Sequence, residues 1–310
     1  MMKLPFLFLL CCFFPSCSTM PSGAEFEGGV EARSFSDQPL LRPAFSEEIQ
    51  ESLEAKLADA EAEHASHPED EMAAIWHGRR LAYLGRYREA VGVFSAALEV
   101  HPSSYKLLRH RGHRYITLRR LDDAVRDLRL ASSLARKFPD LYEPDGAPNP
   151  AGILRSTTRS NIEYHLGLAL YLAGNYQEAL AAWDRCLFLS QVNDDMLVAT
   201  TYWTVLTLWR LDRRDDANSL LGPIRIEMDI IENHDYHHLL LFYKGLLVEA
   251  DMIHLLWKDG LQSAALGFGV AAWNLAHDHE RDAQALFNEV LEATPWAAFG
   301  HIAAEAELAR

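Results

Sequence analysis

The chain has 310 residues, with 29 Lys and Arg against 44 Asp and Glu, giving a formal net charge of −15. An excess of acidic residues argues against sequence-nonspecific nucleic-acid binding, which relies on basic side chains that neutralise phosphates. Of its four cysteines, only Cys186 lies beyond the first 17 residues, so a disulfide framework within the folded body is excluded.

The first 17 residues have the composition of an export signal. Lys3 is followed by an apolar run of 11 residues, from Leu4 to Phe14, which is too short for a spanning helix of about 20 residues. The run ends in Phe14-Pro15-Ser16-Cys17, which resembles a bacterial lipobox. That resemblance implies acylation of Cys17, a lipid anchor in the cell envelope and, because Ser18 follows, sorting to the outer membrane. The alternatives are an ordinary secretory peptide or an uncleaved membrane anchor.

Residues 18–45 are rich in Ser, Pro, Gly and Glu and show no helical period. This composition predicts a flexible acidic tether ahead of a folded body at 46–310. Ser46 is then placed to cap a helix in which Ile49, Leu53 and Leu57 recur every four residues. We expect this helix to cover the start of the folded body.

A pattern of small and large apolar residues returns after 34 positions. Gly78, Leu81, Ala90, Phe94 and Ala97 are matched by Gly112, Tyr115, Ala124, Leu128 and Ala131, and a third set comprises Gly167, Gly174, Tyr176, Ala179 and Trp183. A fixed period of this length predicts pairs of helices that stack on copies of themselves, with small residues where two helices touch.

The pattern is interrupted once and then weakens. Residues 137–160 contain Pro139, Pro144, Pro148 and Pro150, which predicts an inserted loop because proline is unfavourable inside a helix. Degenerate units follow at 202–221, 238–257 and 264–295, and an Ala-rich stretch at 299–308 predicts a closing helix. The sequence thus predicts about six units.

These residues resemble tetratricopeptide repeats (TPR) over roughly residues 70–300. The resemblance implies an all-α, right-handed superhelical solenoid in which the first helix of each pair lines a concave surface. Members of the family usually bind peptides or proteins on that surface and are rarely catalysts. We therefore expect a non-catalytic binding protein without a cofactor, which is exported and attached to the membrane by lipid.

The resemblance places two groups of residues on the concave surface. The first two units contribute Trp76, Arg79, Arg109, His110 and His113, and the later units contribute Tyr164, His165, Tyr202, Trp203, Trp209 and Tyr243. Such a groove would be cationic at one end and aromatic at the other. It would suit an extended peptide with acidic residues, because arginine binds carboxylates through two parallel hydrogen bonds. The other interpretation is that the aromatic residues pack against neighbouring helices.

Charge is divided unevenly along the chain. Residues 24–71 hold 14 acids and 3 bases, a net charge of −11, whereas residues 72–138 hold 14 bases and 5 acids, a net charge of +9. This division suggests the hypothesis that the acidic leader folds back over the basic units and occupies their groove.

Two other functions stay open at the level of sequence. The aromatic cluster around Tyr202 and Trp209 could bind a glycan or another small ligand. A closed aromatic pocket would favour this function, whereas an open groove would favour binding of a protein segment. His234, His237 and His238 could hold a metal for a hydrolase, although the sequence has no H-E-x-x-H pattern. We assign no catalytic or metal-binding residue from the sequence.

Overall fold

The computed structural model describes residues 29–146, 148–257, 261 and 263–310. In this part of the chain a β-hairpin precedes fourteen helices. The hairpin consists of β1 (Val30–Arg33) and β2 (Pro39–Leu41), and α1 (Glu47–Ser66) follows it. Six helix pairs come next: α2 (Glu71–Tyr83) with α3 (Tyr87–Val100), α4 (Tyr105–Thr117) with α5 (Leu121–Ala135), α6 (Thr158–Leu172) with α7 (Tyr176–Ser190), α8 (Asp194–Arg210) with α9 (Arg214–Leu220), α10 (His234–Tyr243) with α11 (Glu249–Trp257), and α12 (Ala264–Ala276) with α13 (Glu280–Ala293). The last element is α14 (Phe299–Leu308). The predicted all-α repeat solenoid is confirmed.

Local sequence signals set the start of five of the six units and the turn inside each unit. Six helices begin at a side chain that accepts a backbone N–H, namely Ser46, Asp70, Ser104, Thr157, Asn193 and Ser263. Such N-caps satisfy amides that have no partner within the helix. In all six pairs the turn between the two helices contains a residue with positive φ: Gly85, Arg119, Gly174, Asp212, Gly245 and Asp278. Glycine adopts this left-handed conformation without steric cost, which explains Gly85 and Gly174 of the repeat pattern.

Within the first three pairs, the small residues of the pattern lie directly beneath large ones. A Cβ atom added to Gly78 would lie 2.3 Å from the ring of Phe94, and one on Gly112 would lie 2.7 Å from Leu128. The equivalent distance from Gly167 to Trp183 is 2.6 Å. Each second helix therefore places a large side chain against the bare backbone of the first, as the sequence predicts.

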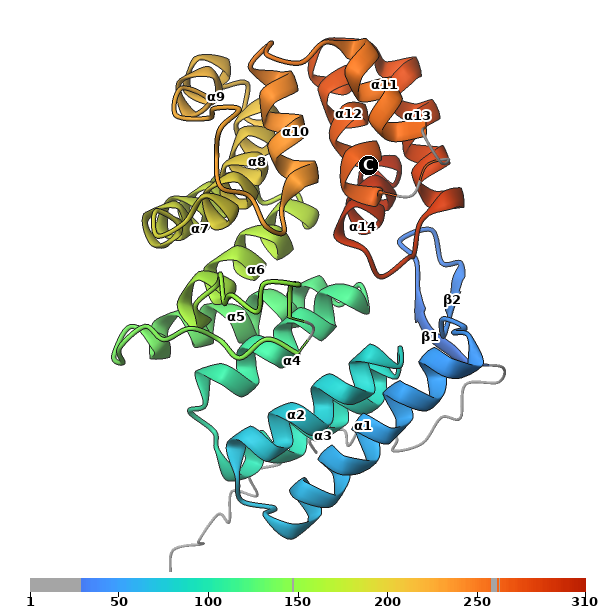
Figure 1. Cartoon of the computed structure of the whole chain (residues 1–310), viewed down its shortest axis with the longest axis vertical. Coiled ribbons are helices and arrows are strands. Elements are labelled where there is room, and N and C mark those ends of the chain that lie inside the picture. Colours follow the sequence, from blue (N-terminus) through green and yellow to red (C-terminus); the bar gives the residue numbers. More distant parts are fainter. Residues whose placement is uncertain (1–28, 147, 258–260, 262) are drawn as a thin grey trace, which may run out of the picture.

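The solenoid curls back on itself, so that its last helix reaches its middle (Figure 1). Helix α14 packs against α12 and α13 and also touches α6. Its residues 300–306 are all buried, and Gly300 permits a close approach, since a Cβ there would lie 2.1 Å from the carbonyl oxygen of Ala264. The closing helix thus occurs at the predicted residues, but it lies inside the molecule instead of covering an end.

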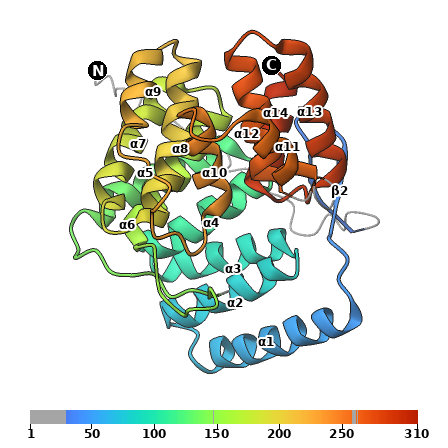
Figure 2. The ribbon, with the colours of Figure 1, turned by 45° about the horizontal axis from the view of Figure 1, so that its top comes forward.

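The segment predicted as a flexible tether differs from that expectation over its described residues. Residues 30–41 form an antiparallel hairpin that lies beside both α3 and the C-terminal helices (Figures 1 and 2). Trp296 Nε1 donates to the Leu41 carbonyl over 2.7 Å, and Arg88 Nε donates to that of Glu31 over 2.6 Å. Ala32 is buried. The hairpin is ordered because it links these two distant parts of the chain, and composition alone does not reveal such contacts.

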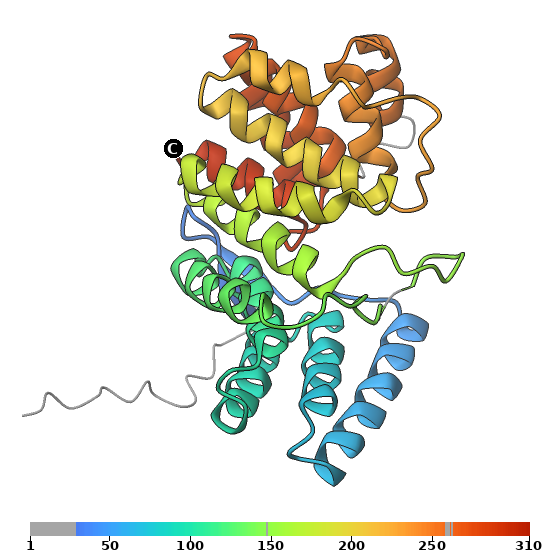
Figure 3. The ribbon, with the colours of Figure 1, turned by 90° about the vertical axis from the view of Figure 1, so that its left-hand side faces the viewer.

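The other long irregular segment is the connection 136–157, which protrudes from the side of the solenoid between α5 and α6 (Figure 3). Its base is fixed where the Glu143 amide donates to the Ser156 carbonyl over 3.0 Å and the Thr158 amide to the Leu141 carbonyl over 2.9 Å. The signal-like residues 1–17, with Cys17, lie outside the described residues. Among the helices that the structure describes, none combines the length and the apolarity needed to cross a bilayer.

Candidate functional site

Three arginines gather where the inner helices α2 and α4 lie side by side. Arg79 comes from α2, and Arg109 and Arg114 come from α4. Together with Tyr83 and Phe94 they line a cavity of about 120 Å³, which we call the arginine pocket. No described carboxylate lines this cavity. Its volume is enough for a carboxylate group or a few water molecules.

Arg109 is the most buried of the three, with only 8% of its surface exposed. Its Nη2 lies 3.0 Å from Oε1 of Glu143 in the 136–157 connection, and its Nη1 donates to His110 Nδ1 over 3.1 Å. Its Nε has no hydrogen-bond partner among the described residues, nor does Oε2 of Glu143. Burial lowers the pKa of Arg109, an effect that the Glu143 carboxylate opposes. The pair is therefore formed but incompletely hydrogen-bonded.

The side chain of Arg79 binds the backbone of the same connection. Its Nη1 donates to the Pro144 carbonyl over 2.6 Å, and Arg80 Nη1 donates to that of Gly146 over 3.4 Å. Both guanidinium groups also lie over the ring of Trp76, at 4.5 and 5.0 Å from its centroid. Trp76, predicted as a groove residue, is half-buried beneath these arginines.

Arg114 completes the pocket without a described carboxylate partner. Its guanidinium lies over the ring of Tyr87, 5.5 Å from the centroid. Burial, together with the charges of Arg109 and Arg79, lowers the pKa of Arg114 to about 10. The group thus remains protonated at neutral pH, and its charge is available to an anion that enters the cavity.

The predicted histidines belong to the same region but carry no charge at neutral pH. Burial is the main cause that lowers the pKa of His110, His113 and His165 well below its ordinary value, and neighbouring arginines add to the effect. His110 stacks on Phe94, with ring centroids 5.8 Å apart. The positive charge of the predicted groove therefore comes from arginine alone.

The predicted concave groove is filled in its middle. The rings of His113 and His165 lie 4.3 Å apart, and Phe299 of α14 lies 5.3 Å from His113 and 5.7 Å from His165. The cationic and the aromatic ends of the predicted groove are therefore separated by these packed rings. Apolar and aromatic side chains on the inner helices are more stable against α14 than against water.

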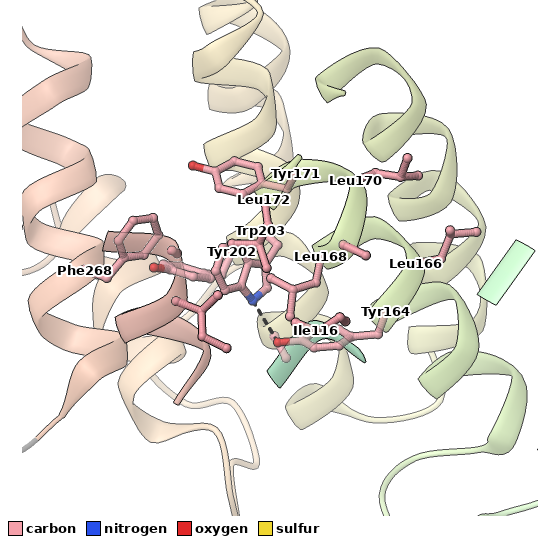
Figure 4. Packing of buried hydrophobic residues seen from close by; sticks show 14 of the residues in the cluster. Ile116, Tyr164, Leu166, Leu168, Leu170, Tyr171, Leu172, Tyr202, Trp203 and Phe268 are labelled. Atoms are coloured by element: carbon pink, nitrogen blue, oxygen red, sulfur yellow. Dashed lines mark hydrogen bonds between the residues drawn. The ribbon is translucent and has the colours of Figure 1, made fainter. Parts of the chain in front are cut away.

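Three of the predicted aromatic ligands are core residues (Figure 4). Tyr202 is 0% and Trp203 1% exposed, and Trp203 Nε1 donates to the hydroxyl of the buried Tyr164 over 2.8 Å. A further ring, Phe268 of α12, stacks on Trp203 at 5.8 Å. These residues have no surface to offer a ligand, so the interpretation as packing residues holds for them.

Trp209 and Tyr243 are only partly buried and lie in the last turns of α8 and α10. Their rings are 4.7 Å apart, and the Tyr243 hydroxyl donates to the Gly269 carbonyl over 2.8 Å. Trp209 borders a cavity of about 180 Å³, with Arg210 and Phe287 also in its wall. The aromatic end of the predicted groove is reduced to this cavity.

The other candidate chemistry finds little support in the geometry. His237 Nε2 lies 2.8 Å from the Arg225 carbonyl, to which it donates. Within the described residues no three His, Cys, Asp or Glu side chains are grouped so as to hold a metal ion. Cys186 is buried beside Thr200, and burial raises the pKa of its thiol to about 11.

Three residues of the site escape the sequence analysis. Arg114 follows His110 by one helical turn, and this spacing is a signal that the sequence does contain. Glu143 is one acidic residue among several in a proline-rich insertion, and Phe299 lies 186 residues from His113 along the chain. For these two, no local pattern predicts the contact.

Comparisons with known proteins agree with the architecture. No protein-family model and no curated protein matches the sequence. Among solved structures, a tetratricopeptide repeat protein from Parabacteroides merdae aligns with a TM-score of 0.50 and 17% identity, over 79% of this chain and 88% of that one. YrrB, described as a TPR protein with an unusual peptide-binding site, aligns with a TM-score of 0.43 and 13% identity, over 75% and 91%. The chain has a TPR-like fold. At these identities the likeness concerns the fold alone.

Proposed function

We propose that this protein is a non-catalytic scaffold that binds an acidic segment of a partner protein at the arginine pocket. The observation that carries the proposal is the imbalance of charge there. The cavity wall holds Arg79, Arg109 and Arg114, and its described lining contains no carboxylate.

Buried guanidinium groups are stable only when they are paired and hydrogen-bonded. Glu143 supplies one carboxylate at the edge of the pocket, but among the described residues Arg109 Nε has no hydrogen-bond partner and Arg114, which lies over the ring of Tyr87, has no carboxylate partner. A carboxylate entering the cavity would supply the missing acceptors. Paired hydrogen bonds from arginine to a carboxylate would then provide both affinity and orientation.

Binding to immobilised peptides of random sequence tests this proposal. We expect the peptides bound by the wild-type protein to be enriched in Asp and Glu, and binding to weaken as salt is added. The double variant Arg79→Gln, Arg114→Gln is expected to lose this enrichment and to bind at least about tenfold less acidic peptide, since a charge-assisted hydrogen bond contributes about 1.5–3 kcal/mol.

The double variant Arg126→Gln, Arg129→Gln is the matched control. It removes the same charge from α5, where the two side chains are 66% and 51% exposed. If both double variants bind alike, the arginine pocket is not the site. Equal binding of neutral and acidic peptides by the wild-type protein would refute the preference for acidic segments.

We further propose that the scaffold is exported and attached to the envelope membrane through a lipid on Cys17. The support is the apolar run after Lys3 and the lipobox-like Phe14-Pro15-Ser16-Cys17. A fatty-acid label fed to cells should be incorporated into the wild-type protein and not into the Cys17→Ser variant. Equal labelling of the two would show that the anchor lies elsewhere, and an unlabelled wild-type protein in the secreted fraction would indicate an ordinary signal peptide.

A second candidate function, binding of a small aromatic carboxylate, rests on the cavity beside Trp209. At about 180 Å³ it has room for one aromatic ring, and Arg210 and Arg214 stand in its wall. Glu307 already pairs with Arg210 over 3.2 Å, however, so this cavity has less unbalanced charge than the arginine pocket. Indole-3-acetate serves as the probe, with binding measured by isothermal titration calorimetry. Binding to the wild-type protein that is lost in Trp209→Phe would favour this function. An absence of binding to the wild-type protein would exclude it for that class of ligand.

A further inference from the structure

We infer that residues 143–146 of the 136–157 connection are an internal occupant of the edge of the arginine pocket, where they hold Arg79 and Arg109, and that a partner's acidic segment must displace them from these two side chains. The inference rests on the proposed function and adds its regulation. It assigns to Glu143-Pro144-Asp145-Gly146 the place and the manner of binding that a partner segment would take.

The contacts of this segment are those of a bound acidic peptide. The Glu143 side chain, 9% exposed, lies against Arg109 at 3.0 Å, and the next carbonyl along the chain, that of Pro144, accepts from Arg79 over 2.6 Å. The carbonyl of Gly146 accepts from Arg80 over 3.4 Å. One carboxylate and two backbone carbonyls, two residues apart, thus meet three arginines of α2 and α4. The segment is irregular, so its backbone is free to form such contacts.

The connection is held mainly by polar contacts. Five large apolar side chains between its ends remain 40–65% exposed: Phe138, Leu141, Tyr142, Ile153 and Leu154. Burial of apolar area is the main stabilising contribution in a folded protein, and this connection gains little of it. Residues 143–146 can therefore leave the pocket by breaking polar contacts, those with the arginines and the Glu143–Ser156 backbone bond, without exposing a hydrophobic core.

Glu143 also fills the pocket incompletely, which leaves room for a better ligand. Its Oε2 and Arg109 Nε both lack hydrogen-bond partners, and Arg114 meets no described carboxylate. A partner carboxylate that enters the 120 Å³ cavity can contact arginines that Glu143 does not reach. The ligand class is therefore an extended segment with a Glu or Asp whose following carbonyl is free to accept from Arg79.

Competition by an internal segment has a measurable consequence. If the segment occupies the pocket for about nine-tenths of the time, the apparent affinity for an external ligand falls about tenfold. The Glu143→Gln variant keeps the size of the side chain but removes its charge. It should weaken occupancy and raise affinity for a ligand by up to about tenfold.

The experiment uses the full chain and a fluorescein-labelled peptide with the sequence of residues 138–146, FPDLYEPDG. Fluorescence anisotropy should show tighter binding to Glu143→Gln than to wild type, by at least about fivefold. Glu227→Gln is the matched control; this exposed residue lies in the connection between α9 and α10 and should leave the affinity unchanged. Adding Arg109→Gln to Glu143→Gln should abolish the gain.

Equal, Arg109-dependent binding of the peptide to wild type and Glu143→Gln would refute the internal occupant while leaving the proposed function intact. Binding that no arginine substitution affects would refute the proposed function instead. Hydrogen exchange tests the occupant without any peptide. The amide of Glu143, which donates to the Ser156 carbonyl over 3.0 Å, should exchange faster in Arg109→Gln than in wild type, and unchanged exchange would show that the pocket does not hold the segment.

Discussion

Replacing Glu305 by alanine is expected to reduce the free energy of unfolding by about 3–5 kcal/mol, since it leaves a buried arginine without its partner. Arg119 Nη2 lies 2.7 Å from Glu305 Oε2, and the two side chains are 4% and 5% exposed. Glu305 also accepts the backbone N–H of Phe35 over 2.5 Å, and Arg119 donates to the Trp296 carbonyl over 2.8 Å. One carboxylate thus joins α14, the α4–α5 turn and the N-terminal hairpin. Urea unfolding followed by far-UV circular dichroism measures the loss.

Two further variants separate this pair from a general effect of charge. Glu178→Ala breaks an ion pair with Arg129 whose side chains are 61% and 51% exposed, and it should cost less than about 1 kcal/mol. The double variant Arg119→Met, Glu305→Leu removes both buried charges and should recover most of the stability that Glu305→Ala loses. If Glu305→Ala costs no more than Glu178→Ala, the contact between α14 and the middle of the solenoid does not stabilise the fold.

The backbone at Arg119 gives independent support for the importance of its side chain. Its φ is 61°, a left-handed conformation, whereas the equivalent turns in the first and third pairs use Gly85 and Gly174 with φ of 73° and 77°. A residue with a Cβ pays about 1–2 kcal/mol in this conformation. The chain accepts that cost at a position where the side chain reaches Glu305.

The second large effect is expected for Trp203→Ala, which should cost about 3–5 kcal/mol because it opens a cavity in the core. Trp203 is 1% exposed, and its ring lies within 6.5 Å of those of Tyr171, Tyr202, Trp183 and Phe268. The substitution also leaves the buried Tyr164 hydroxyl without the 2.8 Å hydrogen bond from Trp203. Urea unfolding combined with near-UV circular dichroism reports both the stability and the packing of the aromatic cluster.

Trp209→Ala provides the comparison. Because Trp209 is only partly buried, this substitution should reduce the free energy of unfolding by less than Trp203→Ala does. The opposite pattern would be informative. A Trp203→Ala protein with wild-type stability that fails to bind a ligand would mean that Trp203 is a binding residue, as the repeat resemblance first suggested.

The features predicted correctly from the sequence are those that depend on neighbours along the chain. Gly78 and Phe94 are 16 residues apart, within one helix pair, and Ser46 is three residues from the amide that it caps. Repetition of such local contacts also predicts how successive pairs stack, since each unit meets the next in the same way.

The features that were missed depend on how the whole chain bends. The repeat pattern places Trp203 and His113 on first helices, but it does not predict that α12 packs against Trp203 and α14 against His113. Glu143 reaches Arg109 only because the connection turns back over α2 and α4, a path set by polar contacts at several points. Likewise the hairpin at 30–41 owes its order to partners such as Trp296, 255 residues from Leu41. Contacts at such separations leave no periodic signal in a single sequence.

The return of α14 to the middle of the solenoid also bears on how such a protein can change in length. An open array can gain or lose a unit, because each unit touches only its neighbours. Here Arg119–Glu305 joins the second helix pair to α14, and Leu41–Trp296 joins the N-terminal hairpin to the segment between α13 and α14. Adding or deleting one internal unit would move these partners out of register. The geometry thus fixes the number of repeats and leaves connections such as 136–157 as the places where insertions are tolerated.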